Sequence, residues 1–227
     1  MNARPALDRL WKARWLLHPA GAYRWFVRPV VDIARDRVLG IDTALPSRHG
    51  KLGFGPERGI HYVASNWGVL KKILEPREIG PGDVLLDVGC GKGAVLCQAM
   101  AYPFARIIGT DLSPDMCAAA TRNVATFSRR YPSANVAVVR ADAATDPVPD
   151  DVTVVYLFNP FIGDVFNAFG DRLMESLARS PRPLRLVYNN PVMHDELLHR
   201  GFRLVRTAEF WARPRSVVHL YQAPGVN

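Results

Sequence analysis

An apolar run that ends abruptly at three glycines is the strongest constraint on the fold. Residues 84–88 read Val-Leu-Leu-Asp-Val and are followed by Gly89, Gly91 and Gly93. A short run rich in Val and Leu predicts a buried strand, and the apolar pattern that resumes at Ala94 predicts a helix. In a strand–turn–helix unit, the N–H groups of the helix N-terminus point at a ligand, and the glycines let its atoms approach the backbone. We therefore expect an α/β unit with a ligand site at this turn.

Three interpretations of the turn can be compared. It can be an ordinary tight connection, and Gly89-x-Gly91-x-x-Ala94 also satisfies the dinucleotide fingerprint. An acid two positions before the first glycine, and a third glycine, favour another reading. The stretch Asp87-Val-Gly-Cys-Gly-Lys-Gly93 resembles motif I of class I S-adenosylmethionine-dependent methyltransferases. In that family the glycine loop wraps the methionine half of the cofactor, and the acid anchors its ammonium end. The resemblance implies cofactor contacts from Asp87, Gly89, Cys90, Gly91 and Gly93.

Two further acids follow predicted strands. Asp111 ends the strand predicted over 105–111 and comes 24 residues after the first acid, near the spacing of one βαβ unit. A carboxylate there can accept both ribose hydroxyls, and Leu112 would then pack on the adenine. After a strand predicted over 135–140, Asp142-Ala143 resembles the family's adenine motif, with the Asp side chain on the amino group and the next N–H on the ring. Either Asp could instead only cap a helix or start a turn.

The fourth predicted strand, 152–158, delivers Asn159-Pro160-Phe161 to the carboxyl end of the sheet, where open α/β folds bind ligands. Side-chain and backbone oxygens here can accept N–H bonds from an amine, and an aromatic face can hold a planar group or a cation. The tripeptide resembles the Asp/Asn-Pro-Pro-Tyr/Phe motif of N-methyltransferases acting on adenine, glutamine and related amides. It lacks the second proline, and its aromatic comes one residue early. Alternatively, it is only a turn that ends a strand.

A segment upstream of the glycine turn is a candidate lid. Tyr62 and Ser65 precede a predicted helix, 68–74, and in many class I methyltransferases such a segment folds over the cofactor. Tyr62 could equally be a core tyrosine. The Tyr-x-x-Ser-x-Trp pattern, the glycine loop and Asn-Pro-Phe together resemble bacterial methyltransferases whose catalytic domain is similar to that of non-SET histone-lysine methyltransferases.

The remaining pattern completes an α/β fold. We expect helices over 114–130, 164–178 and 194–199, a fifth strand over 184–188, and a strand pair at 202–210 and 216–221. The fold class implied is a doubly wound, seven-stranded, mostly parallel sheet with a helical N-terminal extension. We expect two parts, the extension over 1–59 and the cofactor-binding domain over 60–227.

The extension is basic and aromatic. Residues 1–60 hold 11 of the 29 Lys and Arg and 5 of the 21 Asp and Glu, so most of the net charge of +8 lies there. Residues 7–17 have helical apolar spacing, and Tyr23–Arg28 is a second basic-aromatic piece. These aromatics can pack on the catalytic domain while the arginines stay solvated. Alternatively, Trp and Tyr among arginines suit an acidic membrane surface or a nucleic acid.

Composition narrows the classes further. No apolar run approaches the length of a membrane span, and we expect neither a secretory signal nor a metal site. The cysteines, Cys90, Cys97 and Cys117, suit reduced thiols in the cytoplasm. The favoured interpretation is an S-adenosylmethionine-dependent methyltransferase acting on nitrogen of a small molecule or protein. Alternatives are O- or C-methylation, a nicotinamide-dependent oxidoreductase, or a scaffold without turnover. The sequence does not indicate the acceptor or the oligomeric state.

Overall fold

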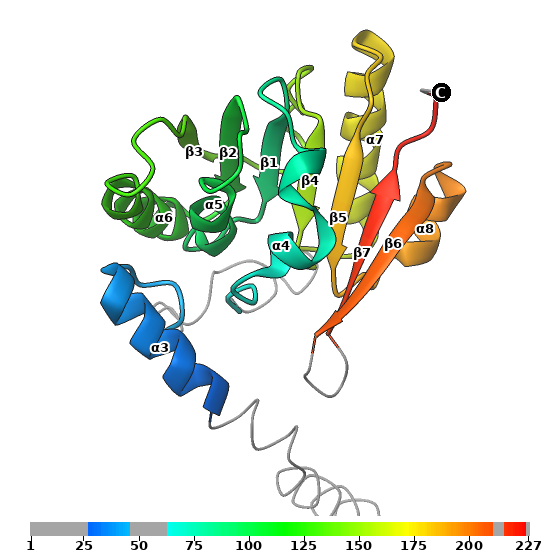
Figure 1. Cartoon of the computed structure of the whole chain (residues 1–227). Helices are drawn as coiled ribbons and strands as arrows, with labels where there is room; N and C mark the ends of the chain where they lie inside the picture. Colours follow the sequence, from blue (N-terminus) through cyan, green and yellow to red (C-terminus); the bar gives the residue numbers. More distant parts are fainter. Residues whose placement is uncertain (1–26, 46–62, 211–215, 226–227) are drawn as a thin grey trace, which may run out of the picture.

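The computed structural model describes residues 27–45, 63–210 and 216–225, which form a seven-stranded sheet with helices on both faces (Figure 1). The strand order is β3-β2-β1-β4-β5-β7-β6. Strands β1 to β5 run parallel, whereas β7 is antiparallel to both β5 and β6. This confirms the expected doubly wound, mostly parallel sheet. The strands are β1 (Val84–Val88), β2 (Arg106–Asp111), β3 (Val136–Arg140), β4 (Val154–Leu157), β5 (Arg185–Asn189), β6 (Arg203–Phe210) and β7 (Ser216–Gln222).

The helices divide between the two faces of the sheet (Figure 1). One core cluster joins the face covered by α4, α5 and α6, and a second joins the face covered by α7 and α8. Successive strand residues point to opposite faces, so Leu85 and Ile107 enter the first cluster and Leu86 and Ile108 the second. The helices are α3 (Arg28–Leu39), α4 (Val69–Ile73), α5 (Ala94–Ala99), α6 (Pro114–Phe127), α7 (Gly163–Arg179) and α8 (His194–His199), with a short 3₁₀ turn at Pro76–Glu78.

The parallel arrangement explains why the candidate residues can meet. The carboxyl ends of β1 to β5 lie at one edge of the sheet, and the loops that follow them begin at that edge. The sequence predicted all seven strands, with ends within about two residues of those observed. Local signals set several boundaries: Ser113 accepts a hydrogen bond from the N–H of Met116 (3.4 Å) and caps α6, and Pro114 occupies its first turn.

Helix α3 belongs to the expected extension, but the sequence pattern did not predict it. It lies beside α6 at the margin of the domain (Figure 1). Its end is held where Gly40, in the left-handed region at φ 72°, donates its N–H to the carbonyl of Arg37, and Leu39 packs against the first core cluster. The predicted helix at 7–17, most of the basic-aromatic piece and Tyr62 lie outside the described residues. Among the helices described, none has the length and apolar character to cross a membrane.

Candidate functional site

The glycine loop is closely packed against the fourth strand's loop. Gly89, Gly91 and Gly93 all have positive φ, at 73°, 52° and 79°. A Cβ placed on Gly89 would lie 2.6 Å from Cβ of Pro160, a separation that real side chains do not adopt. The turn therefore needs glycine for its backbone conformation and, at Gly89, for space. This contact brings the Asn159-Pro160 segment directly against the predicted cofactor loop.

Asp87 is a buried carboxylate at the start of this loop. Asp87 is 2% exposed, and no ion pair among the described residues involves its carboxylate. Burial, reinforced by the negative charge of Asp111, raises the pKa of Asp87 well above its ordinary value. A cationic group placed beside the pair would offset both effects.

Asp111, at the tip of β2, is tied to the glycine loop. One carboxylate oxygen accepts the N–H of Gly91 (2.9 Å), and the other accepts the N–H of Ser113 (2.9 Å). Burial raises the pKa of Asp111, and these two hydrogen bonds oppose the shift. Each carboxylate oxygen has a second lone pair, so both can still accept a hydroxyl. Leu112, the next residue, is half-buried.

The tip of β4 carries Asn159 in a strained conformation. Its φ is 44°, uncommon for a residue other than glycine. The hydroxyl of Tyr188, at the tip of neighbouring β5, donates to Oδ1 of Asn159 (3.3 Å). Residues held in sparsely populated backbone regions cluster at functional sites, where the surrounding structure enforces them. Asn159 and Pro160 are thus presented at the same sheet edge as Asp87 and Asp111.

Phe161, which follows Pro160, is buried in the core. It is 5% exposed and belongs to the second core cluster. Its ring centroid is 5.7 Å from that of Phe169 and 6.4 Å from that of Phe166, both on α7. Its described contacts therefore anchor the loop to α7, and its predicted role as an acceptor wall rests on the motif resemblance alone.

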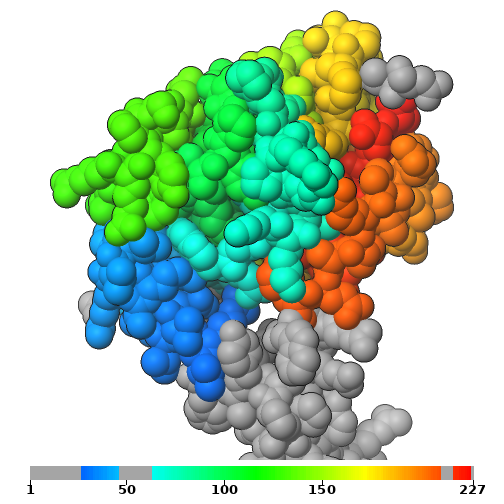
Figure 2. All heavy atoms as spheres, viewed as in Figure 1, coloured from blue at the N-terminus to red at the C-terminus, as the bar shows by residue number. Residues whose placement is uncertain are grey.

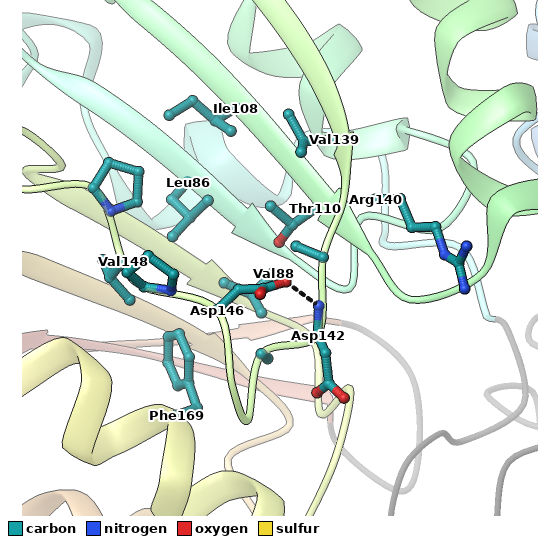
Figure 3. A pocket seen from close by; sticks show the side chains of 14 residues that line it. Leu86, Val88, Ile108, Thr110, Val139, Arg140, Asp142, Asp146, Val148 and Phe169 are labelled. Atoms are coloured by element: carbon teal, nitrogen blue, oxygen red, sulfur yellow. Dashed lines mark hydrogen bonds between the residues drawn. The ribbon is translucent and has the colours of Figure 1, made fainter.

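Asp142 and Ala143 border a cavity of about 220 Å³ on the α7 side of the sheet (Figure 3). Its floor is apolar and includes Leu86, Val88 and Ile108. The cavity exists because the connection from β3 to β4 forms no helix over this part of the sheet. The N–H of Asp142 donates to Asp146 Oδ2 (2.8 Å), and the Asp142 carboxylate points away from the apolar floor (Figure 3).

Ser65, expected in a lid, takes part in a polar chain under the same edge. The buried hydroxyl of Tyr156 donates to Ser65 Oγ (3.0 Å) and accepts from Asn189 Nδ2 (3.1 Å). Sequence reasoning did not single out Tyr156 or Asn189. The available signals were a tyrosine inside an otherwise apolar strand and a second strand end, Asn189-Asn-Pro191, that repeats the Asn-Pro of β4.

A second group missed by the sequence reasoning joins the extension to the glycine loop. Lys92, itself in that loop, donates from Nζ to Asp42 Oδ2 and to the carbonyl of Leu45, both at 2.9 Å. Asn123 of α6 accepts the N–H of Asp42 and donates to the carbonyls of Asp42 and Lys92, each at 2.9 Å. Nothing in the local pattern marks these residues, since 31 to 81 positions separate Asn123 from its partners.

Cys90, also predicted at the cofactor, lies buried in the glycine turn, and burial together with nearby Asp87 and Asp111 raises the pKa of its thiol. All three cysteines are free thiols.

Comparison with known proteins agrees with this arrangement. Residues 85–183 match a family model described as a methyltransferase domain. A search of curated proteins by sequence found no match. Among solved structures, a SAM-dependent methyltransferase from Aquifex aeolicus is 16% identical, with a TM-score of 0.51, covering 69% of this chain and 93% of that one.

Two more structures resemble the fold. Thermoplasma acidophilum 1320 is 19% identical with a TM-score of 0.51, covering 69% of this chain and 87% of its own. A protein described as StiE O-MT is 14% identical with a TM-score of 0.54, covering 70% and 73%. At such identities these similarities establish the fold alone.

The sheet order and its reversed β7 are those of the class I methyltransferase fold. Together with the match of residues 85–183 to a methyltransferase domain, this fold is that of an S-adenosylmethionine-dependent methyltransferase enzyme.

Proposed function

We propose that this enzyme methylates nitrogen, with Asn159 and Pro160 orienting the acceptor. The observation that carries the proposal is the forced conformation of Asn159 beside the glycine loop: positive φ, Oδ1 aligned by Tyr188, and Pro160 packed on Gly89. An amide oxygen and backbone carbonyls at this point would accept N–H bonds from an amine and direct its lone pair at the methyl group.

In the proposed cofactor site, the ammonium end lies near Asp87, which a cation would stabilise in its charged form. Asp111 accepts the ribose hydroxyls. Gly89, Cys90, Gly91 and Gly93 form the wall around the methionine half, and Ser65 and Tyr62 close the site from upstream. Leu112, Asp142 and Ala143 would receive the adenine.

Methyl transfer is an in-line displacement: the acceptor nitrogen forms a bond to carbon while the carbon–sulfur bond breaks, and the sulfonium becomes a neutral thioether. The nitrogen becomes positively charged and then loses a proton to solvent. The described residues contribute mainly position and water exclusion, which are the largest requirements of such a step. From the sequence patterns given above, we also propose that the cofactor-binding domain begins near residue 60. The same patterns support the narrower similarity to non-SET histone-lysine methyltransferases.

The cofactor assignment is tested by Asp111→Ala, with Asp115→Ala as the matched control. Asp115 is an exposed acid on the first turn of α6, close in sequence and without a bond to the glycine loop. Calorimetry should show a loss of S-adenosylmethionine affinity of at least about tenfold for Asp111→Ala and little change for Asp115→Ala. Unchanged affinity in Asp111→Ala would remove the ribose assignment.

The nitrogen assignment needs a product. Methyl-labelled cofactor is incubated with size-fractionated cell extract, and the labelled fraction is analysed by mass spectrometry for the methylated atom. We expect a methylamine or methylamide that Asn159→Ala forms far more slowly while retaining cofactor affinity. Label on oxygen or carbon would contradict the proposal.

A further inference from the structure

Helix α3 has its polar and apolar sides reversed relative to an ordinary surface helix. Most of its charged side chains face the domain, Arg37 being exposed: Arg28 donates to the carbonyl of Ala64 (3.1 Å), and the Arg35 guanidinium lies 4.5 Å from the ring centre of Trp67. Asp36 is 4% exposed. A surface helix normally buries its apolar side and exposes its charges. The residues that the structure describes therefore leave the valine side of α3 largely uncovered.

That apolar side is a continuous stripe, here called the valine stripe. Its members recur at helical spacing and are exposed: Val27 (47%), Val30 (65%), Val31 (53%), Ala34 and Val38 (78%). Figure 2 shows α3 in blue on the outside of the molecule, beside the green atoms of α6. Single exposed valines are ordinary, but a run of them along one helix face indicates a partner.

We propose that the valine stripe rests on an acidic membrane surface. The 26 residues directly before it hold five basic residues against one acid, Asp8, and five aromatics. The basic residues are Arg4, Arg9, Lys12, Arg14 and Arg24; the aromatics are Trp11, Trp15, Tyr23, Trp25 and Phe26. Basic residues with Trp, Tyr and Phe, joined to an apolar helix face, are the composition that binds the interface of anionic lipids.

Other occupants fit the stripe less well. Four valines and an alanine on one helix are far short of the roughly 800 Å² that each partner of a standard interface buries, so a second copy gains little. A segment of this chain packed on the stripe would contact α3 alone, because α3 lies between the stripe and the domain. A nucleic acid would use the arginines but would leave the valines exposed to water. A lipid surface uses both the charge and the apolar area.

The test is vesicle co-sedimentation of the full chain with phosphatidylcholine alone and with phosphatidylcholine mixed with phosphatidylglycerol. We expect binding to the mixed vesicles, little binding to the neutral ones, and weaker binding in high salt. The double variant Val31→Gln/Val38→Gln should lower the bound fraction at least about fivefold, since it removes apolar contact without changing charge. Its fold is checked by circular dichroism and melting temperature.

The matched control is Val192→Gln/Val205→Gln, two valines that are 58% and 49% exposed outside α3. This variant should bind vesicles like the parent. Equal loss in both variants, or no binding of the parent to anionic vesicles, overturns the proposal. So does a parent dimer that only Val31→Gln/Val38→Gln dissociates, or stripe-dependent retention on RNA without retention on lipid.

Discussion

Two aspartates in different regions are almost equally buried but have opposite surroundings. Asp36, on the buried side of α3, is 4% exposed and accepts hydrogen bonds from the N–H groups of Thr43 and Ala44 and from the Arg35 guanidinium. Asp87, at the glycine loop, is 2% exposed, and burial together with the negative charge of Asp111 raises its pKa. Burial of a carboxylate is stabilising only where donors surround it. The first aspartate therefore stabilises the fold, whereas the second lacks such donors, which suits the proposed role of Asp87 beside a cationic ligand.

The largest expected effect is on the first of these aspartates. Asp36→Ala would leave two backbone N–H groups and a guanidinium without their acceptor, at a cost of about 3 kcal/mol of unfolding free energy. Urea unfolding measures it. The control is Asp32→Ala, which removes ion pairs to Arg28 and Arg35 in a less buried place and should cost less than about 1 kcal/mol. Equal losses in the two variants would contradict the distinction drawn between the aspartates.

The second prediction is that one substitution, Asp87→Asn, raises the stability of the protein and lowers its affinity for the cofactor. Asp87→Asn keeps the shape and removes a buried charge beside Asp111, so the cofactor-free protein should melt at a higher temperature. Its affinity for S-adenosylmethionine should fall at least about tenfold, or about 1.4 kcal/mol, because the cation loses its partner. Thermal melting and calorimetry on the same samples measure both. If Asp87→Asn is destabilised but binds the cofactor normally, Asp87 stabilises the fold as Asp36 does and does not bind the cofactor.

The pH dependence of melting tests the same residue. The raised pKa of Asp87 means that the folded chain holds this proton more tightly than the unfolded chain does. The stability linked to Asp87 is therefore fully present below the unfolded pKa and is lost as pH rises through the folded pKa. In Asp87→Asn the melting temperature should not show this decline with rising pH. If the decline persists, a group other than Asp87 causes it.

The smallest effect concerns the link between the two regions. Asn123→Ala removes three hydrogen bonds that hold Asp42 against Lys92 of the glycine loop. We expect S-adenosylmethionine affinity to fall about threefold, or about 0.7 kcal/mol, with kcat nearly unchanged, because Lys92 positions the loop without contacting the acceptor. Thr121→Ala, an exposed change on the same helix, is the control. Equal affinity in the two variants would show that the regions act independently.

Much of the fold could be predicted because its signals are local. Short runs of Val, Leu and Ile that end at glycine, aspartate or asparagine mark β1, β2 and β4, and Ser113-Pro114 marks the start of α6. Parallel strands then place their carboxyl ends together, so Asp87, Asp111 and Asn159 could be expected at one edge. Helix α3 was not predicted, although its valines recur at helical spacing; which of its sides meets the domain depends on contacts with distant residues such as Ala64 and Trp67.

The sequence by itself determined which segments form strands, the need for glycine at the turn, and the class of cofactor. These depend on backbone conformation and on residues within a few positions of each other. Only the tertiary structure decided that Phe161 enters the core, that Tyr188 aligns Asn159, and that Asn123 ties Asp42 to the glycine loop. Such contacts join distant segments, and their energies depend on burial and on partners that appear only when the chain is folded.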